Sequence, residues 1–359
     1  MEKVLMKGNE AISEGAIRAG CMAYFGYPIT PQNEIPAYMS LHMLAKDRVF
    51  IQAESEVAAI NMVYGASCAG ARAMTSSSSP GISLKQEGIS YAAGADVPCV
   101  IVNVSRGGPG LGSIAPAQGD YFQTVKGGGH GDYFCLVLAP KSVQECADFT
   151  YQAFDLAEQY RIPVIVLLDG MLGQLLEGVV LPPEKSIGEL PKRSWCVGNM
   201  AKTADSGGKV RDSRHITSID LVPEQLERKN KVRFERYETI KKTEVRFESI
   251  GCEDADIILT AYGTSARICQ EARKLAEKQG IKAGFFRPIT LWPFPNNELA
   301  KIAERGKPIL TVEMSLGQMV EDVRLAVLGK APVHLLGHCG GVIPKEEEIL
   351  EEIRKILGK

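Results

Sequence analysis

The sequence predicts an α/β protein made of two three-layer domains, each a parallel sheet with helices on both faces. Short apolar runs alternate with amphipathic stretches over the first half of the chain, and the same alternation returns in the last third. Strands that alternate with helices are typical of parallel sheets covered on both faces. The length of 359 residues also exceeds that of one average domain.

The first domain is expected to span residues 1–182, and it opens with a short strand directly after Met1-Glu2-Lys3. Apolar runs predict further strands at residues 23–26, 48–52, 73–75, 98–104, 134–139 and 163–168. Amphipathic stretches predict helices at residues 8–19, 33–43, 56–69, 85–93 and 143–158.

The last domain, residues 251–359, repeats the pattern. Strands are expected at residues 255–261, 282–286, 308–312 and 333–336, and helices at residues 267–279, 298–304, 318–328 and 345–357. Residues 183–250 differ, because they are rich in both acids and bases and poor in long apolar runs. This composition predicts a connecting segment with one surface helix near residues 224–243 and an exposed loop at residues 204–209.

Charge and cysteine usage exclude several function classes. The net charge of −2 leaves no global field that would recruit nucleic acid or a membrane. Apolar runs such as residues 164–168 are too short to cross a bilayer, and no signal segment opens the chain, so a cytoplasmic location is the expectation. None of the nine cysteines forms a C-x-x-C pair. We therefore expect buried thiols and neither zinc nor iron–sulfur clusters in this chain.

Glu56 is the first candidate for chemistry. It follows Ser55, a good N-cap residue, at the start of a predicted helix. The helix dipole favours a carboxylate in a first turn, so a purely structural role explains Glu56 as well as a functional one. In the functional interpretation, this acid hydrogen-bonds the aminopyrimidine N1′ of thiamine diphosphate, as activation of that cofactor requires. Glu54 is a neighbouring rival for the same role.

Three further segments follow predicted strands, where ligands of parallel sheets bind. Thr30 stands between two prolines in a rigid turn, which could also be a plain helix start. Arg106 enters a glycine-rich loop, where its guanidinium could hold a carboxylate or simply lie on the surface. The serine run that contains Ser78 and Ser79 could bind an anion, line a cofactor pocket or form an ordinary loop.

The glycine-rich loop also allows a different class of function. Its run Gly110-x-Gly112-x-x-Ala115 is similar to a dinucleotide-binding fingerprint, which would make the protein a nicotinamide-dependent dehydrogenase. No helical pattern starts at Gly112, and Pro116 follows it. A pyrophosphate would therefore meet no helix N-terminus, and this interpretation is disfavoured.

A set of runs spread over most of the chain carries a family resemblance: Met6-Lys7-Gly8-Asn9-Glu10-Ala11, Gly26-Tyr27-Pro28-Ile29-Thr30-Pro31, Glu54-Ser55-Glu56, residues 75–84, Arg106-Gly107-Gly108-Pro109, Ala261-Tyr262-Gly263-Thr264-Ser265 and residues 287–295. Together they resemble the alpha subunit of the 2-oxoacid:ferredoxin oxidoreductases. The resemblance implies a pyrimidine-binding domain of a thiamine-diphosphate enzyme, followed by a transketolase C-terminal-like domain.

The resemblance also implies roles for individual residues. It makes Glu56 the catalytic acid and assigns the substrate to Thr30 and Arg106. The cofactor-binding set that it implies is Pro28, Ile29, Glu56, Ser78 and Ser79. No metal ligand is implied in this chain.

The implied reaction is oxidative decarboxylation of a 2-oxoacid to an acyl-coenzyme A, with reduction of ferredoxin. A beta subunit would supply the diphosphate and magnesium site, while a gamma subunit and a ferredoxin-like subunit would complete the complex and carry iron–sulfur clusters. The absence of a Gly-Asp-Gly magnesium loop and of cluster cysteines agrees with this split. The runs around Arg106 and Ser78 are most similar to the branched-chain (2-oxoisovalerate) type. The 2-oxoglutarate type and a non-catalytic scaffold subunit are the alternatives.

Overall fold

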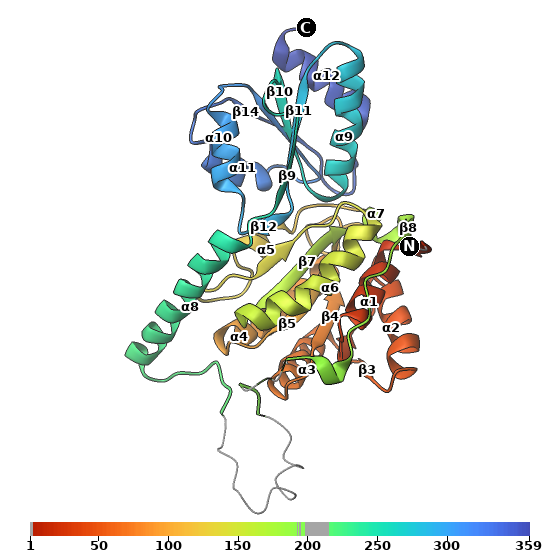
Figure 1. The fold of residues 1–359 in the computed structure, drawn as a ribbon, viewed down its shortest axis with the longest axis vertical. Helices are drawn as coiled ribbons and strands as arrows, with labels where there is room; N and C mark the ends of the chain where they lie inside the picture. Colours follow the sequence, from red (N-terminus) through yellow and green to blue (C-terminus); the bar gives the residue numbers. More distant parts are fainter. Residues whose placement is uncertain (1–2, 192, 194, 198–214) are drawn as a thin grey trace, which may run out of the picture.

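The computed structural model describes residues 3–191, 193, 195–197 and 215–359 (Figure 1). The loop expected at residues 204–209 lies outside these residues. The described strands form sheets of seven, five and two strands. The two larger sheets lie in two bodies that follow one another along the long axis, with the C-terminal body at the top of the view.

The seven-stranded sheet has the strand order β12-β6-β7-β5-β4-β2-β3. Six of its strands are parallel and confirm the strands predicted for the first region: β2 (Ala23–Gly26), β3 (Val49–Gln52), β4 (Ala73–Ser77), β5 (Cys99–Ser105), β6 (Leu136–Leu138) and β7 (Pro163–Asp169). Strands β5 and β7 are buried along their whole length, which is why they read as continuous apolar runs.

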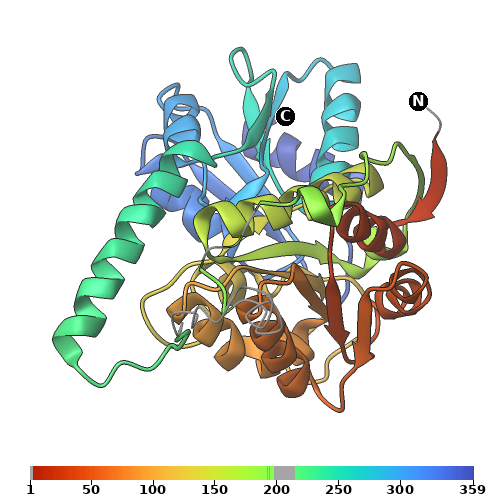
Figure 2. The same cartoon turned by 60° about the horizontal axis from the view of Figure 1, so that its bottom comes forward.

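Helices cover both faces of this sheet, as the prediction of three layers requires. On one face α1 (Gly8–Arg18) packs against α6 (Val143–Tyr160), with α2 (Glu34–Leu44) beside α1. On the other face α3 (Glu56–Cys68) packs against α4 (Ser79–Gly94) (Figure 2). Two short helices, α5 (Tyr121–Val125) and α7 (Gly170–Gln174), follow β5 and β7.

Helix α4 begins earlier than the sequence predicts. The expected start was residue 85, but the helix begins at Ser79, directly after the extended Ser78. Pro80 lies in the first turn, where a missing backbone N–H breaks no helical hydrogen bond. The serine run is therefore a helix N-terminus and not a loop, and its hydroxyls lie where the candidate site is found.

The five-stranded sheet has the order β14-β13-β10-β11-β9. Its parallel strands confirm the four predicted for the last region: β10 (Ile257–Thr260), β11 (Ala283–Pro288), β13 (Ile309–Glu313) and β14 (Val333–Gly337). The accompanying helices are α9 (Gly263–Lys278), α10 (Asn296–Ala303), α11 (Met319–Val327) and α12 (Glu346–Leu357). Helices α9 and α12 pack together, as do α10 and α11.

Short antiparallel strands at the sheet edges were not predicted. Strand β9 (Phe247–Ile250) pairs with β11, and β12 (Thr290–Trp292) crosses to the other body and pairs with β6. Strand β8 (Leu176–Val179) pairs with β1 (Val4–Lys7) in a separate two-stranded sheet. Such strands are too short, or too exposed, to stand out from a loop in the sequence.

The connecting segment contains the predicted surface helix, α8 (Pro223–Thr243), which projects from the molecule. Most of its charged residues are exposed, and only Arg233, Tyr237 and Ile240 are buried. Tyr237 anchors it, because its ring packs edge-on against Phe134 and Trp292. A short 3₁₀ turn (Ile187–Glu189) lies earlier in the segment. None of the helices in the described part of the chain has the length and apolarity that a membrane span needs.

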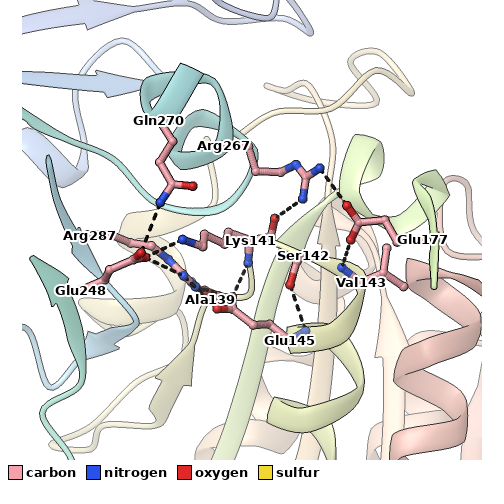
Figure 3. Close-up of polar contacts among 10 residues, drawn as sticks. All are labelled: Ala139, Lys141, Ser142, Val143, Glu145, Glu177, Glu248, Arg267, Gln270 and Arg287. Atoms are coloured by element: carbon pink, nitrogen blue, oxygen red, sulfur yellow. Dashed lines mark hydrogen bonds and ion pairs between the residues drawn. The ribbon is translucent and has the colours of Figure 1, made fainter. Parts of the chain in front are cut away.

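A polar junction joins the two bodies (Figure 3). Arg287 of β11 is completely buried and donates to both carboxylate oxygens of Glu145 at 2.9 and 2.5 Å, and to the main-chain oxygen of Ala139 at 3.0 Å. Glu248 of β9 pairs with Lys141 at 2.5 Å and lies 3.5 Å from Arg287. Arg287 is the buried charge of this junction, and its partly exposed partners pair with it, so the contacts hold the bodies in one arrangement.

Gln118 fixes the glycine-rich loop to the C-terminal body. Its Nε2 donates to the main-chain oxygen of Tyr262 at 2.9 Å. Its Oε1 accepts from Ser265 Oγ at 2.8 Å and from the main-chain N–H of Met314 at 2.9 Å. The loop that starts at Arg106 is therefore anchored at its far end by the other sheet.

Candidate active site

Four neighbouring parallel strands of the seven-stranded sheet, in the order β5-β4-β2-β3, end at one edge. Each leads into a segment that carries predicted site residues: Arg106 after β5, Ser78 and Ser79 after β4, the Thr30 turn after β2 and Glu56 after β3. The parallel arrangement thus brings all of these segments to the same side of the sheet.

Glu56 begins α3, and its side chain is buried with 6 % of its surface exposed. Ser55 is the N-cap, because its Oγ accepts a hydrogen bond from Ala58 N at 3.2 Å. Among the described residues, Lys85 Nζ donates a hydrogen bond to the main-chain oxygen of Glu56 at 3.3 Å and not to its carboxylate. The carboxylate itself accepts no hydrogen bond from these residues, although the residue is only 6 % exposed. The rival Glu54 is exposed.

A glycine leaves room for the Glu56 carboxylate. A Cβ atom added to Gly81, in the first turn of α4, would lie 2.6 Å from Glu56 Oε1 and 2.1 Å from Ser77 Oγ. The hydroxyls of Ser77 and Ser78 are buried and lack a hydrogen-bond partner within the described residues. An unpaired carboxylate beside the unpaired Ser77 hydroxyl suits a ring that carries nitrogen donors and acceptors, such as an aminopyrimidine. The residues present therefore fit the pyrimidine of thiamine diphosphate.

Arg106 is a buried residue and not the surface arginine that its loop position allowed. Only 8 % of its surface is exposed. Nη1 donates to the main-chain oxygen of Thr30 at 2.9 Å, and Nη2 donates to that of Leu111 at 3.0 Å. Its Nε is buried and has no partner within the described residues. Nε and the remaining Nη hydrogens are therefore free to bind a carboxylate.

The first turn of α4 links Arg106 to Glu56. The main-chain N–H of Arg106 donates to Ser79 Oγ at 2.9 Å, and Gly81, two residues further on, lies against the Glu56 carboxylate. The structure therefore brings Glu56, Arg106 and the serine run together around one helix N-terminus, whose dipole favours anions.

Two family models match the chain. Residues 14–246 match the pyruvate flavodoxin/ferredoxin oxidoreductase family, thiamine diphosphate-binding, and residues 255–349 match core domain II of pyruvate:ferredoxin oxidoreductase. The chain belongs to the 2-oxoacid:ferredoxin oxidoreductase family.

Similar proteins agree over the full length. The ketoisovalerate oxidoreductase subunit VorB of Methanothermobacter thermautotrophicus is 49% identical, covering 100% of this chain and 99% of that protein. The 2-oxoglutarate synthase subunit KorA of the same organism is 37% identical, with 99% of both chains covered. The family resemblance read from the sequence is thus confirmed.

Solved structures show the same fold. A 2-oxoglutarate:ferredoxin oxidoreductase from Magnetococcus marinus matches with a TM-score of 0.84 and 27% identity, covering 99% of this chain and 65% of that longer chain. A split-gene transketolase matches with a TM-score of 0.60 and 14% identity, covering 98% of both chains, and supports the fold alone. The predicted fold class is confirmed by both.

The remaining predicted residues of this family member lie in the Thr30 turn. Thr30 and Pro28 are exposed, and Ile29 is half-buried. Thr30 Oγ1 accepts from Asn33 Nδ2 at 3.4 Å, so its hydroxyl proton stays free for a ligand. The next carbonyl, that of Pro31, accepts from Asn9 Nδ2 at 2.9 Å. Arg106 and Asn9 therefore hold the turn from two sides, through the main-chain oxygens of Thr30 and Pro31.

Lys85 is a charged residue of the site that the sequence analysis missed. Its side chain is fully buried in α4, one turn beyond Gly81, and Nζ donates to Thr75 Oγ1 at 3.1 Å besides the Glu56 main chain. Burial lowers the pKa of Lys85 to about 8, although the charge of Glu56 partly opposes this. Only tertiary contacts reveal it, since a lysine in an amphipathic stretch normally faces solvent.

Asp120 is a second missed residue. Its Oδ2 accepts from Ser79 Oγ at 2.7 Å and from Asn103 Nδ2 at 2.8 Å. Burial raises the pKa of the Asp120 carboxyl, and hydrogen bonds from Ser79 and Asn103 offset part of that rise. Asp120 orients the Ser79 hydroxyl that holds Arg106. No local pattern marks it, because it stands in a loop between β5 and α5.

The glycine-rich loop is not built as a dinucleotide-binding turn. The helix that follows it within the described residues, α5, begins only at Tyr121. A Cβ on Gly112 would lie 1.8 Å from the main-chain oxygen of Gly107, so Gly112 serves to fold the loop back on itself. The loop thus presents no helix start at Gly112 for a pyrophosphate.

Proposed function

We propose that this chain is the pyrimidine-binding subunit of a thiamine-diphosphate-dependent 2-oxoacid:ferredoxin oxidoreductase. The complex would convert a 2-oxoacid and coenzyme A to an acyl-coenzyme A and carbon dioxide, with transfer of two electrons to ferredoxin. The observation that carries the proposal is the buried Glu56, whose carboxylate lies against Gly81 and accepts no hydrogen bond from the described residues. The thiamine diphosphate-binding family model supports the cofactor.

Bound thiamine diphosphate supplies a nucleophilic carbon for the oxo group and an acceptor for the electrons released when carbon dioxide leaves. Glu56 shares a proton with the pyrimidine N1′, and Ser78, Ser79, Pro28 and Ile29 form the wall around the ring. Arg106 binds the substrate carboxylate through Nε and Nη hydrogens that are not used within the chain. Thr30 donates its hydroxyl proton to the oxo group.

The partners of this chain supply the remaining groups. We assign the magnesium and diphosphate site to a beta subunit, and the iron–sulfur clusters to partner chains that include a gamma subunit and a ferredoxin-like subunit. An external ferredoxin accepts the electrons. The similar proteins are named as subunits, which supports a multi-subunit complex in general. A cytoplasmic complex follows, since coenzyme A and ferredoxin are used there.

The substrate we propose is a branched-chain 2-oxoacid, 3-methyl-2-oxobutanoate. Support comes from sequence identity, which is 49% to the ketoisovalerate oxidoreductase subunit and 37% to the 2-oxoglutarate synthase subunit of one organism.

We also propose that residues 1–182 and 251–359 act as separate domains joined by residues 183–250. The strands β9 and β12 then belong to the contact between them.

Two adjacent acids provide the test. In a complex reconstituted with its partner subunits, Glu56→Gln should lower thiamine-dependent reduction of ferredoxin by roughly 10²–10⁴-fold, because a proton-transferring side chain is lost. Glu54→Gln, the exposed neighbour, is the matched control and should keep the rate within about twofold. Near-normal turnover of Glu56→Gln would sink the proposal. A complex that neither binds thiamine diphosphate nor turns over would support the scaffold alternative.

A further inference from the structure

An open cleft lies beside Thr30. Its volume is about 480 Å³, within the range of small-molecule sites. The walls are mainly apolar, with Ile114 from the glycine-rich loop, Met171 from α7 and Ile343 from the segment before α12. Ile114 and Met171 are 66% and 41% exposed. Large apolar side chains gathered in a hollow and left exposed are typical of a ligand site.

The cleft adjoins the residue proposed to hold the substrate carboxylate. Arg106 Nη1 donates to the main-chain oxygen of Thr30, and Thr30 is itself part of the cleft wall. Ile114 follows Arg106 in the same loop. A 2-oxoacid held by Arg106 and Thr30 therefore has the cleft within reach of its side chain.

The charge of the cleft discriminates between the side chains of different 2-oxoacids. Among its lining residues Glu34 alone is charged, and no cation is present. Burial by itself would raise the pKa of Glu34, but hydrogen bonds from Gln174, Asn9 and Lys7 lower it below the ordinary value. Lys7 Nζ is already engaged by Glu34 at 3.3 Å and by Gln174 at 3.0 Å. A second substrate carboxylate in the cleft would thus meet the Glu34 carboxylate, while the neighbouring cation, Lys7, is already paired with Glu34.

We infer that this cleft binds the aliphatic side chain of the 2-oxoacid, and that Glu34 excludes dicarboxylic 2-oxoacids. This assignment rests on the proposed function and deepens it, because it places substrate selection in this chain. Selection then has both an attractive part, the apolar wall, and a repulsive part, the anion.

Competition between substrates tests the inference in the reconstituted complex. The measured quantity is the kcat/KM ratio of 3-methyl-2-oxobutanoate to 2-oxoglutarate. Ile114→Arg adds a cation and removes apolar wall, so it should shift the ratio towards 2-oxoglutarate by about 100-fold or more. Leu325→Arg, made at an equally exposed leucine on α11, should leave the ratio within about twofold.

A binding measurement and a second variant keep the result independent of turnover. Calorimetric titration with the unreactive 3-methylbutanoate should show binding to the wild-type complex that Ile114→Arg weakens about tenfold or more. Glu34→Gln should raise kcat/KM for 2-oxoglutarate by about tenfold, since the carboxylate charge is removed and Lys7 loses its ion-pair partner.

Two results would overturn the inference while leaving the proposed 2-oxoacid:ferredoxin oxidoreductase activity intact. One is an unchanged substrate ratio in both Ile114→Arg and Glu34→Gln. The other is a wild-type complex that uses 2-oxoglutarate as well as it uses 3-methyl-2-oxobutanoate. A wild-type complex that fails to reduce ferredoxin with any 2-oxoacid would contradict the proposed function itself, and the inference with it.

Discussion

Glu56 and Glu313 are two buried acids, one in each body, that differ in how their carboxylates are used. Glu313 ends β13 and is completely buried. It accepts from Ser315 Oγ at 2.6 Å and from three main-chain N–H groups that lead into α11, at 3.0 to 3.1 Å. Glu56, at the start of α3, accepts no hydrogen bond through its carboxylate from the described residues. The Glu313 carboxylate completes the fold, whereas the Glu56 carboxylate is left for a ligand.

Two of the buried arginines, Arg287 and Arg106, repeat this contrast. Arg287 at the junction is paired with Glu145 and Glu248, whereas Arg106 contacts only main-chain oxygens through its side chain. Unpaired hydroxyls do not discriminate in the same way, because Thr260 and Thr311 of the second sheet are also buried without a partner. The comparison teaches that an unpaired charged group, rather than a polar group in general, marks the site.

The largest expected effect is a reversal between the two acids. Glu56→Gln should reduce turnover roughly 10²–10⁴-fold and change the free energy of unfolding by less than about 1 kcal/mol. Glu313→Gln should lower the free energy of unfolding by about 3 kcal/mol, because buried N–H groups lose a charged acceptor. Urea unfolding and ferredoxin reduction, measured on both variants, check this. Equal losses of stability in the two variants would break the comparison.

The arginine pair gives the next effect. Arg106→Ala should raise KM for the 2-oxoacid about 10- to 100-fold, because a bidentate charged contact is lost. Arg287→Ala should leave KM unchanged and destabilise the chain by about 3 kcal/mol, because Glu145 is left without its buried partner. Steady-state kinetics and urea unfolding separate the two. A raised KM for the 2-oxoacid in Arg287→Ala would contradict this separation and show that the junction positions the substrate site.

Lys85 makes the site region sensitive to pH. Its folded pKa of about 8 lies below the ordinary 10.5, so the folded state disfavours the charged amine. Between these values the unfolded chain binds more protons, and stability rises with pH. Compared with Lys85→Met, the wild type should gain about 3 kcal/mol in the free energy of unfolding from pH 8 to 10.5. A wild-type minus variant difference that stays flat over this range would contradict the burial of the amine.

The smallest effect tests the link between α4 and Arg106. Ser79→Ala removes the acceptor of the Arg106 N–H and the donor to Asp120. It should raise KM for the 2-oxoacid several-fold and lower the free energy of unfolding by about 1 kcal/mol. Ser83→Ala, at an exposed serine one turn along the same helix, is the control and should change neither quantity. A KM equal to that of the wild type would remove Ser79 from the positioning of Arg106.

Local pattern explains which parts of the fold and site could be predicted. The apolar runs of β5 and β7 and the N-cap Ser55 before Glu56 are visible in sequence, because strand burial and capping are local properties. Lys85 and Asp120 could not be predicted, since their roles come from contacts with residues on other elements. The start of α4 was missed because serine and proline suggest a loop, although both suit a first helical turn.

The edge strands show the same limit. Residues 290–292 were expected in the C-terminal body, yet β12 pairs with β6 of the other sheet. Nothing within three residues can indicate a partner strand about 150 positions away, because long-range pairing is decided by packing of the whole chain. The cleft beside Thr30 is equally invisible in sequence, since its walls come from four separate segments.

A structure of the reconstituted complex with thiamine diphosphate bound tests the central claim most directly. The account predicts a hydrogen bond between the Glu56 carboxyl group and the pyrimidine N1′, with the Arg106 guanidinium facing the reactive carbon side of the cofactor. A pyrimidine ring held by Glu54 or by a partner residue, with the Glu56 carboxylate still lacking a ligand, would contradict it.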